Sequence, residues 1–232
     1  MKVGILIIGS LFWDTEKGRP DWRKNHLVFK KKIKVSVPIR YGRLSNNGRT
    51  YTMVFSKGVQ EKSNLGIAYL IPLKEIIHNT DELFNEAQAL SKAEGNDTNL
   101  IIGHTNWAVI SILFNPKSSI DKYEIETKWE ENINKNDLTD FLQKHIKIEP
   151  PLINKKGVLD ISWLQAIEEE QQNEVDLFDI ILTTCTLPTG YLNPKQHAKI
   201  ANTDLRKYFK NNQKYGILTF EDDEIRTELN KV

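Results

Sequence analysis

Cysteine is almost absent from this 232-residue sequence, because Cys185 is the only one. A single cysteine excludes an intramolecular disulfide and a zinc site built from cysteines, and it is typical of a reducing compartment. Apolar runs also fall far short of the roughly 20 residues that span a bilayer. The amino-terminal run from Val3 to Ile8 is too short for the core of a usual signal peptide. We therefore expect a cytoplasmic protein that makes no use of a membrane.

An excess of either charge is missing as well. The 32 basic and 31 acidic side chains leave a formal net charge of +1, so no overall field attracts nucleic acid or an anionic surface. The five histidines are scattered, and none has a partner at His-x-x-x-His spacing. We therefore predict no metal site.

Four segments within the first 72 residues have the patterns of β-strands. Lys2 to Ile8 is almost continuously apolar and β-branched, which is typical of a fully buried strand. Lys30 to Ile39 alternates between apolar and polar residues, which is typical of a half-buried strand. Two further strands are predicted over Thr50 to Ser56 and Leu65 to Pro72. Four such strands indicate a small sheet or barrel.

The spacing of apolar residues then changes to that of a helix. Thr80 begins this segment with acidic residues in the next two positions, where the helix dipole favours them. Leu83, Ala87 and Leu90 define an apolar stripe, and Gly95 ends the helix. A strand over Ile110 to Phe114 follows.

The second half of the chain predicts mostly helices. The expected helices cover Asn136 to His145, Asp160 to Glu170 and Asn193 to about Asn211, with one strand from Asp179 to Leu187. The polar segment from 118 to 136 suggests a boundary between a domain over residues 1–124 and an α-rich extension over 125–232. Alternatively, these carboxy-terminal elements pack directly on the first sheet. The predicted fold class is α+β, a small mixed sheet or barrel with a flanking helix and a mostly helical extension.

Glu94 is the charged residue that the helical pattern places on an apolar face. At about 100° per residue it falls within roughly 60° of Leu83, Ala87 and Leu90. Burial and the negative end of the helix dipole should both raise the pKa of such a carboxylate, which suits a general base. Alternatively, the helix ends before Glu94 and the side chain reaches water or Lys92. Helix geometry leaves both alternatives open.

The first strand ends abruptly at Gly9-Ser10. Successive backbone N–H groups of a glycine-containing turn can form a small anion-binding concavity. Gly9 also lacks the Cβ that would block close approach. Gly9 and Ser10 are therefore candidate binding residues, and an ordinary turn after a strand is the alternative.

Four segments, taken in order, resemble the γ-glutamylcyclotransferase superfamily, particularly its ChaC-like branch. They correspond to its Tyr-Gly-Ser-Leu loop, a basic and aromatic strand, a Gly-Val-Ala-Tyr strand and the end of the helix that carries the catalytic glutamate. In this sequence they are Ile8-Gly-Ser-Leu-Phe-Trp13, Pro38-Ile-Arg-Tyr-Gly-Arg-Leu-Ser45, Gly66-Ile-Ala-Tyr-Leu-Ile-Pro72 and Leu90-Ser-Lys-Ala-Glu-Gly95. The resemblance covers residues 1 to 115, and Ile8 stands where the family has tyrosine.

The resemblance implies an activity and a set of roles. The amides of Gly9, Ser10 and Leu11 would hold the γ-glutamyl part of a small-molecule substrate, and Glu94 would be the catalytic base. The substrate's own α-amine would attack its γ-carbonyl, which yields 5-oxoproline and releases an amine. No metal or organic cofactor is implied, because the nucleophile is tethered to the group it attacks.

Two other functions stay open. A binding module on the same fold would hold a small acid without turning it over, and the isoleucine at position 8 favours this alternative. The basic segment Lys30 to Lys34, with Arg40, Tyr41, Arg43, Arg49 and Tyr51, would suit nucleic-acid binding. The near-neutral net charge disfavours the nucleic acid. Cys185, in an apolar strand, is more typical of an inert buried thiol than of a nucleophile.

Overall fold

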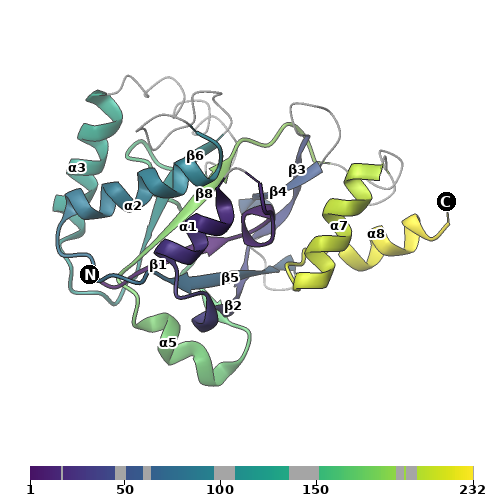
Figure 1. The fold of residues 1–232 in the computed structure, drawn as a ribbon, viewed down its shortest axis with the longest axis horizontal. Helices are drawn as coiled ribbons and strands as arrows, with labels where there is room; N and C mark the ends of the chain where they lie inside the picture. Colours follow the sequence, from purple (N-terminus) through teal and green to yellow (C-terminus); the bar gives the residue numbers. More distant parts are fainter. Residues whose placement is uncertain are drawn as a thin grey trace.

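The computed structural model describes residues 1–16, 18–44, 51–59, 64–96, 108–135, 152–191, 196 and 203–231. A mixed six-stranded sheet forms its centre, in the order β6-β8-β1-β5-β2-β7 (Figure 1). The bounds of these strands are β1 (Val3–Ile7), β2 (Ile33–Val37), β5 (Gly66–Pro72), β6 (Ala108–Phe114), β7 (Gln165–Ala166) and β8 (Ile180–Thr186). β1 and β8 are parallel, and the other neighbouring pairs are antiparallel.

A second, two-stranded sheet consists of β3 (Ile39–Leu44) and β4 (Tyr51–Phe55). Pro38 separates β2 from β3, because proline has no N–H with which to continue the ladder. The strand that we predicted over Lys30 to Ile39 is therefore shorter, and its first residues form a 3-10 turn at Phe29–Lys31.

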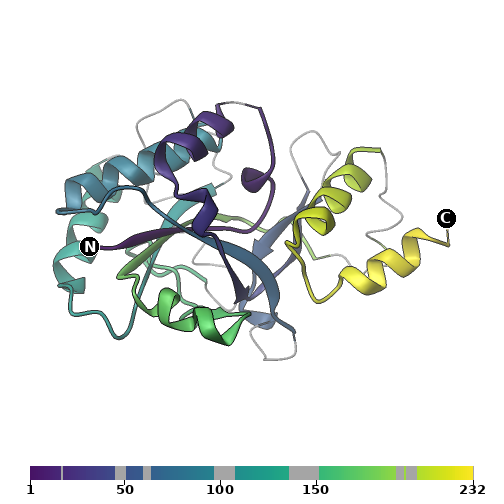
Figure 2. The same cartoon turned by 60° about the horizontal axis from the view of Figure 1, so that its bottom comes forward.

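Helices cover both faces of the main sheet. Figure 2 shows α1 (Arg19–His26) and α2 (Thr80–Ala93) over one face, and α5 (Gln172–Asp176) on the other. α3 (Lys122–Lys135) lies beside α2, where Trp129 stacks on Phe84 with ring centroids 4.8 Å apart. α7 (Thr203–Tyr215) and α8 (Asp222–Leu229) lie at the end of the molecule next to β3 and β4 (Figure 1).

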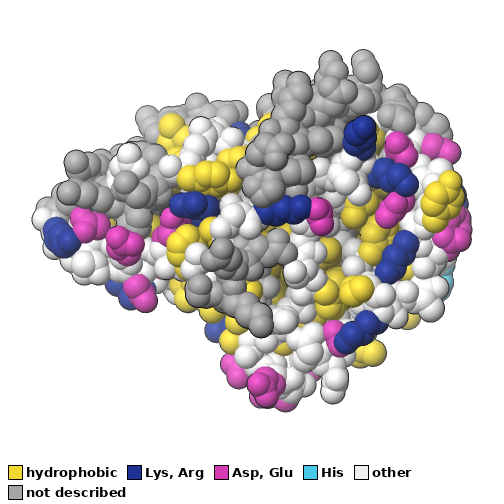
Figure 3. Space-filling model, turned by 180° about the vertical axis from the view of Figure 1, so that it is seen from behind, with side chains coloured by type: hydrophobic (Ala, Val, Ile, Leu, Met, Phe, Trp, Pro, Cys, Tyr) yellow, Lys and Arg dark blue, Asp and Glu magenta, His cyan; other side chains and the backbone are white. Residues whose placement is uncertain are grey.

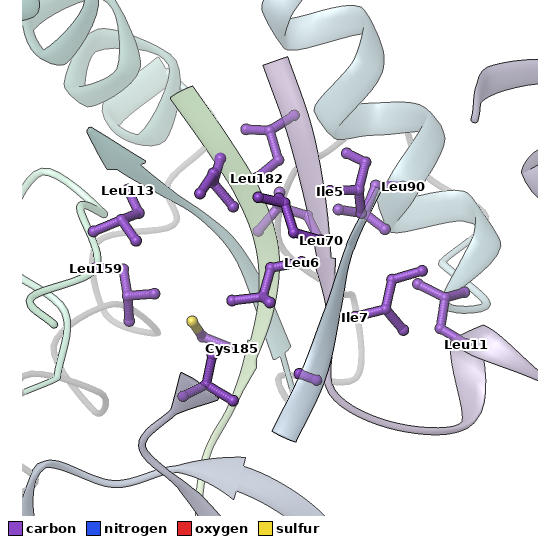
Figure 4. Packing of buried hydrophobic residues seen from close by; sticks show 14 of the residues in the cluster. Ile5, Leu6, Ile7, Leu11, Leu70, Leu90, Leu113, Leu159, Leu182 and Cys185 are labelled. Atoms are coloured by element: carbon purple, nitrogen blue, oxygen red, sulfur yellow. The ribbon is translucent and has the colours of Figure 1, made fainter. Parts of the chain in front are cut away.

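The period-two alternation of β1 divides the core between the two faces. Figure 4 shows Ile5 and Ile7 gathered with Leu11 beside Leu90 of α2, whereas Leu6 lies on the opposite side of the strand. All of these side chains are buried. α2 therefore buries the apolar stripe predicted from its sequence against β1 and the turn that follows it.

The α+β fold class is confirmed, with a mixed sheet, flanking helices and a helical carboxy-terminal part. The helix expected over Asp160 to Glu170 is wrong, because this segment contains β7 and only one 3-10 turn, Glu169–Gln171. The helix expected over Asn136 to His145 lies outside the described residues. No helix in the described part of the chain is long and apolar enough to cross a bilayer.

The second half of the chain contributes to the main sheet. β8 lies between β1 and β6, so residues 180–186 complete the sheet begun by the first half. Residues 125–232 were expected either to form a separate extension or to pack directly on the first sheet. The position of β8 agrees with direct packing. A boundary at residue 124 would divide hydrogen-bonded neighbours.

Candidate functional site

The turn after β1 is a single 3-10 turn over Ser10–Phe12. The N–H of Phe12 donates to the carbonyl of Gly9 at 3.0 Å, and the N–H of Trp13 donates to the carbonyl of Ser10 at 3.0 Å. The N–H groups that begin a helical turn have no acceptor within it, so the amides of Ser10 and Leu11 lead this turn. A 3-10 turn of this kind is compatible both with the proposed anion-binding turn and with an ordinary turn after a strand.

Arg23 of α1 fixes the position of this turn. Its Nη1 donates to the carbonyl of Leu11 at 2.6 Å, and its Nη2 donates to the carbonyl of Asp14 at 2.8 Å. The side chain of Leu11 is buried beneath α2 (Figure 4). Guanidinium donors and apolar burial thus both hold the turn in place.

Glu94 is the residue that caps the carboxyl end of α2. Its backbone N–H still donates to the carbonyl of Leu90 at 3.1 Å, and its side chain is only 14% exposed. Arg19 Nη2 lies 3.3 Å from Glu94 Oε2, and Arg19 Nε donates to the carbonyl of Ala93 at 3.1 Å. The remaining Arg19 donor pairs with Asp14.

The surroundings of Glu94 therefore differ from those expected from its helical face. We expected a carboxylate among apolar side chains or one that reaches Lys92 or water. The observed carboxylate is largely buried and pairs with a guanidinium from α1, 75 residues away in the sequence. This pairing offsets part of the cost of burying the carboxylate charge.

The side chain of Tyr208, from α7, lies against the turn at Gly9. Burial raises the pKa of Tyr208 to about 12, and the charge of Glu94 acts in the same direction. The Asn212 side chain and the backbone N–H of Ser10 oppose this shift, because both lie within hydrogen-bonding reach of the hydroxyl. The phenol therefore keeps its proton at neutral pH. Its hydroxyl oxygen would lie 2.6 Å from a Cβ at Gly9.

Trp13 connects the same helix to the other end of the turn. Its Nε1 donates to Asn212 Oδ1 at 3.0 Å, and its ring meets the Tyr208 ring edge-on with centroids 5.7 Å apart. The two aromatic residues at the end of the turn, Phe12 and Trp13, thus have different contacts. Phe12 is buried in the core and stacks on Tyr69, while Trp13 holds α7 against the turn.

Arg19 and Tyr208 were not among the predicted site residues. Arg19 begins α1, for which Pro20 near the start of a helix was an available signal. Tyr208 belongs to the helix predicted from Asn193 to about Asn211. No local pattern connects either residue with Gly9 or Glu94.

The other candidate chemistries have little support from the described residues. No group of three or more histidine, cysteine, aspartate or glutamate side chains there is arranged to hold a metal ion. Cys185 is fully buried, and burial raises the pKa of its thiol to about 12. A thiol of that kind does not supply a nucleophilic thiolate at neutral pH.

Several of the residues suggested for nucleic-acid binding are engaged within the protein, whereas the lysines of the segment from Lys30 to Lys34 are exposed. Tyr41 is fully buried, and the Tyr51 hydroxyl donates to the carbonyl of Gly190. Arg40 donates to Glu221 at 2.6 Å and stacks on the ring of Tyr191. Arg49 lies outside the described residues. Basic and acidic side chains are intermingled on the face drawn in Figure 3, in keeping with the near-zero net charge.

Comparison with known proteins adds no family to this description. No family model, no curated protein and no solved structure matches the chain. The geometry of the site, made of the turn after β1, Glu94, Arg19 and Tyr208, is therefore the basis for a function.

Proposed function

We propose that the protein is a cyclotransferase-like enzyme that acts on a γ-glutamyl or related aminoacyl compound. Glu94 is the general base, and the amides of Gly9, Ser10 and Leu11 bind the substrate. The reaction needs no metal or organic cofactor. The protein is proposed to work in the cytoplasm, where the unpaired Cys185 stays reduced.

One observation carries the proposal: the buried Arg19 side chain pairs with Asp14, which directly follows the turn, and with Glu94 at the end of α2. Two segments 80 residues apart in the sequence thus meet at one guanidinium group. An anion-binding turn and a carboxylate base at one place are the two parts that the resemblance requires. Arg19 also donates to the carbonyl of Ala93 at 3.1 Å, which fixes the end of α2 that carries Glu94.

In the proposed reaction, Glu94 takes a proton from the substrate's α-ammonium group. The freed amine attacks the γ-carbonyl carbon and closes a five-membered ring, and the bond between that carbon and the leaving nitrogen breaks. The proton held by Glu94 passes to the leaving nitrogen, which restores the base, and the ring nitrogen gives up its second proton, which the released amine takes up to become an ammonium ion. Ring closure is intramolecular, and effective concentrations in such reactions reach about 10⁵–10⁸ M.

The test is release of 5-oxoproline from a panel of γ-glutamyl dipeptides, γ-glutamylamines and glutathione, measured by mass spectrometry. We expect Glu94→Gln to lower kcat by about 10²–10⁴-fold, because it removes a general base while keeping the size of the side chain. Substrate affinity should change little.

Glu86→Gln is the matched control for this test. Glu86 lies on the same helix, and its Oε2 is 2.8 Å from Nδ1 of His26 rather than near the turn after β1. It should therefore retain turnover. Equal turnover in wild type and Glu94→Gln would remove Glu94 from the mechanism, and a silent panel for the wild-type protein would remove the proposed activity.

A small-molecule binding module is the second candidate, and Ile8, which stands where the family has tyrosine, favours it. Tight binding of a γ-glutamyl compound without 5-oxoproline release would identify the binding module.

A further inference from the structure

Two threonine side chains at the carboxyl end of β8 belong to neither the core nor any described hydrogen bond. Thr184 is 8% exposed, and the Oγ1 atoms of Thr184 and Thr186 are buried. Among the described residues, neither hydroxyl has a hydrogen-bond partner. A buried hydroxyl without a partner destabilises a fold, so its presence needs a reason.

The neighbouring hydroxyl on the same strand provides a comparison. Thr183 points to the other face of the sheet and donates to the carbonyl of Leu6 at 2.9 Å. β8 therefore satisfies one of its buried hydroxyls internally and leaves two others unsatisfied. The two unsatisfied hydroxyls are two residues apart, so they share one face of the sheet.

That face is the one that carries α2 and Glu94. Leu6 pairs with Thr183 in the parallel ladder, so Thr184 and Thr186 share the face of Ile5 and Ile7. Figure 4 shows Ile5 and Ile7 beside Leu90 of α2, with Cys185 on the opposite side. The hydroxyls thus face the side from which α2 presents Glu94.

The strand ends bring these hydroxyls level with the turn after β1. The printed pairs of the parallel ladder end at Leu6 and Thr183, so Thr184, Thr186 and the turn after β1 all follow it at the same end of the two strands. The carboxyl ends of parallel strands meet at one edge of a sheet, and ligands of open sheets bind at this edge. The turn, Glu94 and the two hydroxyls therefore lie toward the same end of the sheet.

We propose that Thr184 and Thr186 bind the α-carboxylate of an amino-acid-like substrate. They would form the third part of the site, beside the turn after β1 and Glu94. This inference rests on the proposed function, in which Glu94 contacts the substrate's α-ammonium group. The carboxylate of an α-amino acid is attached to the same carbon as the ammonium group, so it lies next to the base. The two threonines are about 7 Å apart along the strand, which leaves room for an acceptor group with a hydrogen bond of about 2.7 Å to each hydroxyl.

The test compares two ligands by calorimetry, in a Glu94→Gln background that removes turnover. One ligand is γ-L-glutamyl-L-alanine, and the other is 4-aminobutanoyl-L-alanine, which lacks only the α-carboxylate. We expect the first to bind about tenfold or more tightly than the second, because each hydroxyl donates to a charged acceptor. In Thr184→Val with Thr186→Val, the two ligands should bind about equally.

Stability measurements separate binding from folding. Valine keeps the shape of threonine and removes an unsatisfied hydroxyl, so Thr184→Val and Thr186→Val should leave Tm unchanged or raise it. Thr183→Val should lower Tm by about 2–4 °C, because it removes a satisfied hydrogen bond, and should keep the preference between the ligands. An unchanged preference in the Thr184 and Thr186 variants would overturn the inference.

The outcomes also separate this inference from the proposed function. A wild-type protein that releases no 5-oxoproline but shows the threonine-dependent preference would lose the activity and keep the carboxylate site. Turnover that depends on Glu94 with no threonine-dependent preference would keep the activity and remove the carboxylate site.

Discussion

Gly9 is required by a neighbouring side chain rather than by its own backbone conformation. Its φ of −170° is extended, and any residue can adopt it. A Cβ at this position would lie 2.6 Å from the Tyr208 hydroxyl oxygen, closer than real Cβ contacts, but 3.8 Å from Tyr208 Cζ. The hydroxyl alone therefore makes the position specific for glycine.

This contact gives a prediction at the scale of one atom. Gly9→Ala should lower the free energy of unfolding by about 1–3 kcal/mol, as overpacking does in a tight interior. In a Tyr208→Phe background the same substitution should cost less than about 1 kcal/mol, because the clashing oxygen is absent. Urea unfolding of the four proteins in this cycle measures both costs. Equal costs in the two backgrounds would show that the hydroxyl is not the cause.

The residues of the site differ in how far they could be predicted. Gly9, Ser10 and Glu94 belong to local patterns, the end of an apolar strand and the stripe of a helix. Arg19 and Tyr208 reach the site through contacts across 75 or more residues, which no local period records. The pairing of Glu94 with Arg19 could for this reason not be predicted from the sequence.

At the scale of elements, α8 begins with a buried acid. Asp222 is 3% exposed and accepts from the N–H and hydroxyl of Thr219 and from Gln213. Burial nevertheless raises its pKa from 3.8 to about 6. The pKa of its neighbour Glu221 is also raised, mainly by burial, with Arg40 opposing the shift.

The shift makes α8 sensitive to pH. Because the folded protein binds the Asp222 proton more tightly than the unfolded chain does, the contribution of this group to stability is full below pH 3.8 and falls as pH rises through 6. The free energy of unfolding of wild type, relative to Asp222→Asn, should therefore fall by roughly 2–3 kcal/mol from pH 4 to pH 7. Chemical unfolding across this range measures the difference. A constant difference would contradict the raised pKa.

Helices and strands could be predicted where several apolar residues recur at the spacing of a helix or of a strand. The alternation of Ile33, Val35 and Val37 gave β2, and the stripe of α2 gave a helix with the observed end within one or two residues. The segment from Asp160 offered only three apolar residues at spacing three. One of them, Leu164, is buried, whereas Ile167 is exposed, because Gln165–Ala166 pairs with the edge of β2. A short edge strand has too few residues to show its period.

At the scale of the whole molecule, β8 decides whether the first half can fold alone. Without residues 180–186, β1 loses its parallel partner and β6 loses its only described strand neighbour. We expect a protein of residues 1–124 to show no cooperative unfolding transition in urea, while the full chain shows one. A cooperative transition in the fragment would support a domain boundary at residue 124.

The pairing of β1 with β8 also sets the order of events during synthesis. Leu6 and its partner Thr183 are separated by 177 residues, so the first strand leaves the ribosome long before its neighbour exists. At about 5–20 residues per second, this wait lasts on the order of 10–35 s. During it, the most apolar segment of the chain has one open edge, which is a template for association with other chains. The nascent protein is therefore most exposed to aggregation before translation of β8, and its yield should depend on chaperones at that stage.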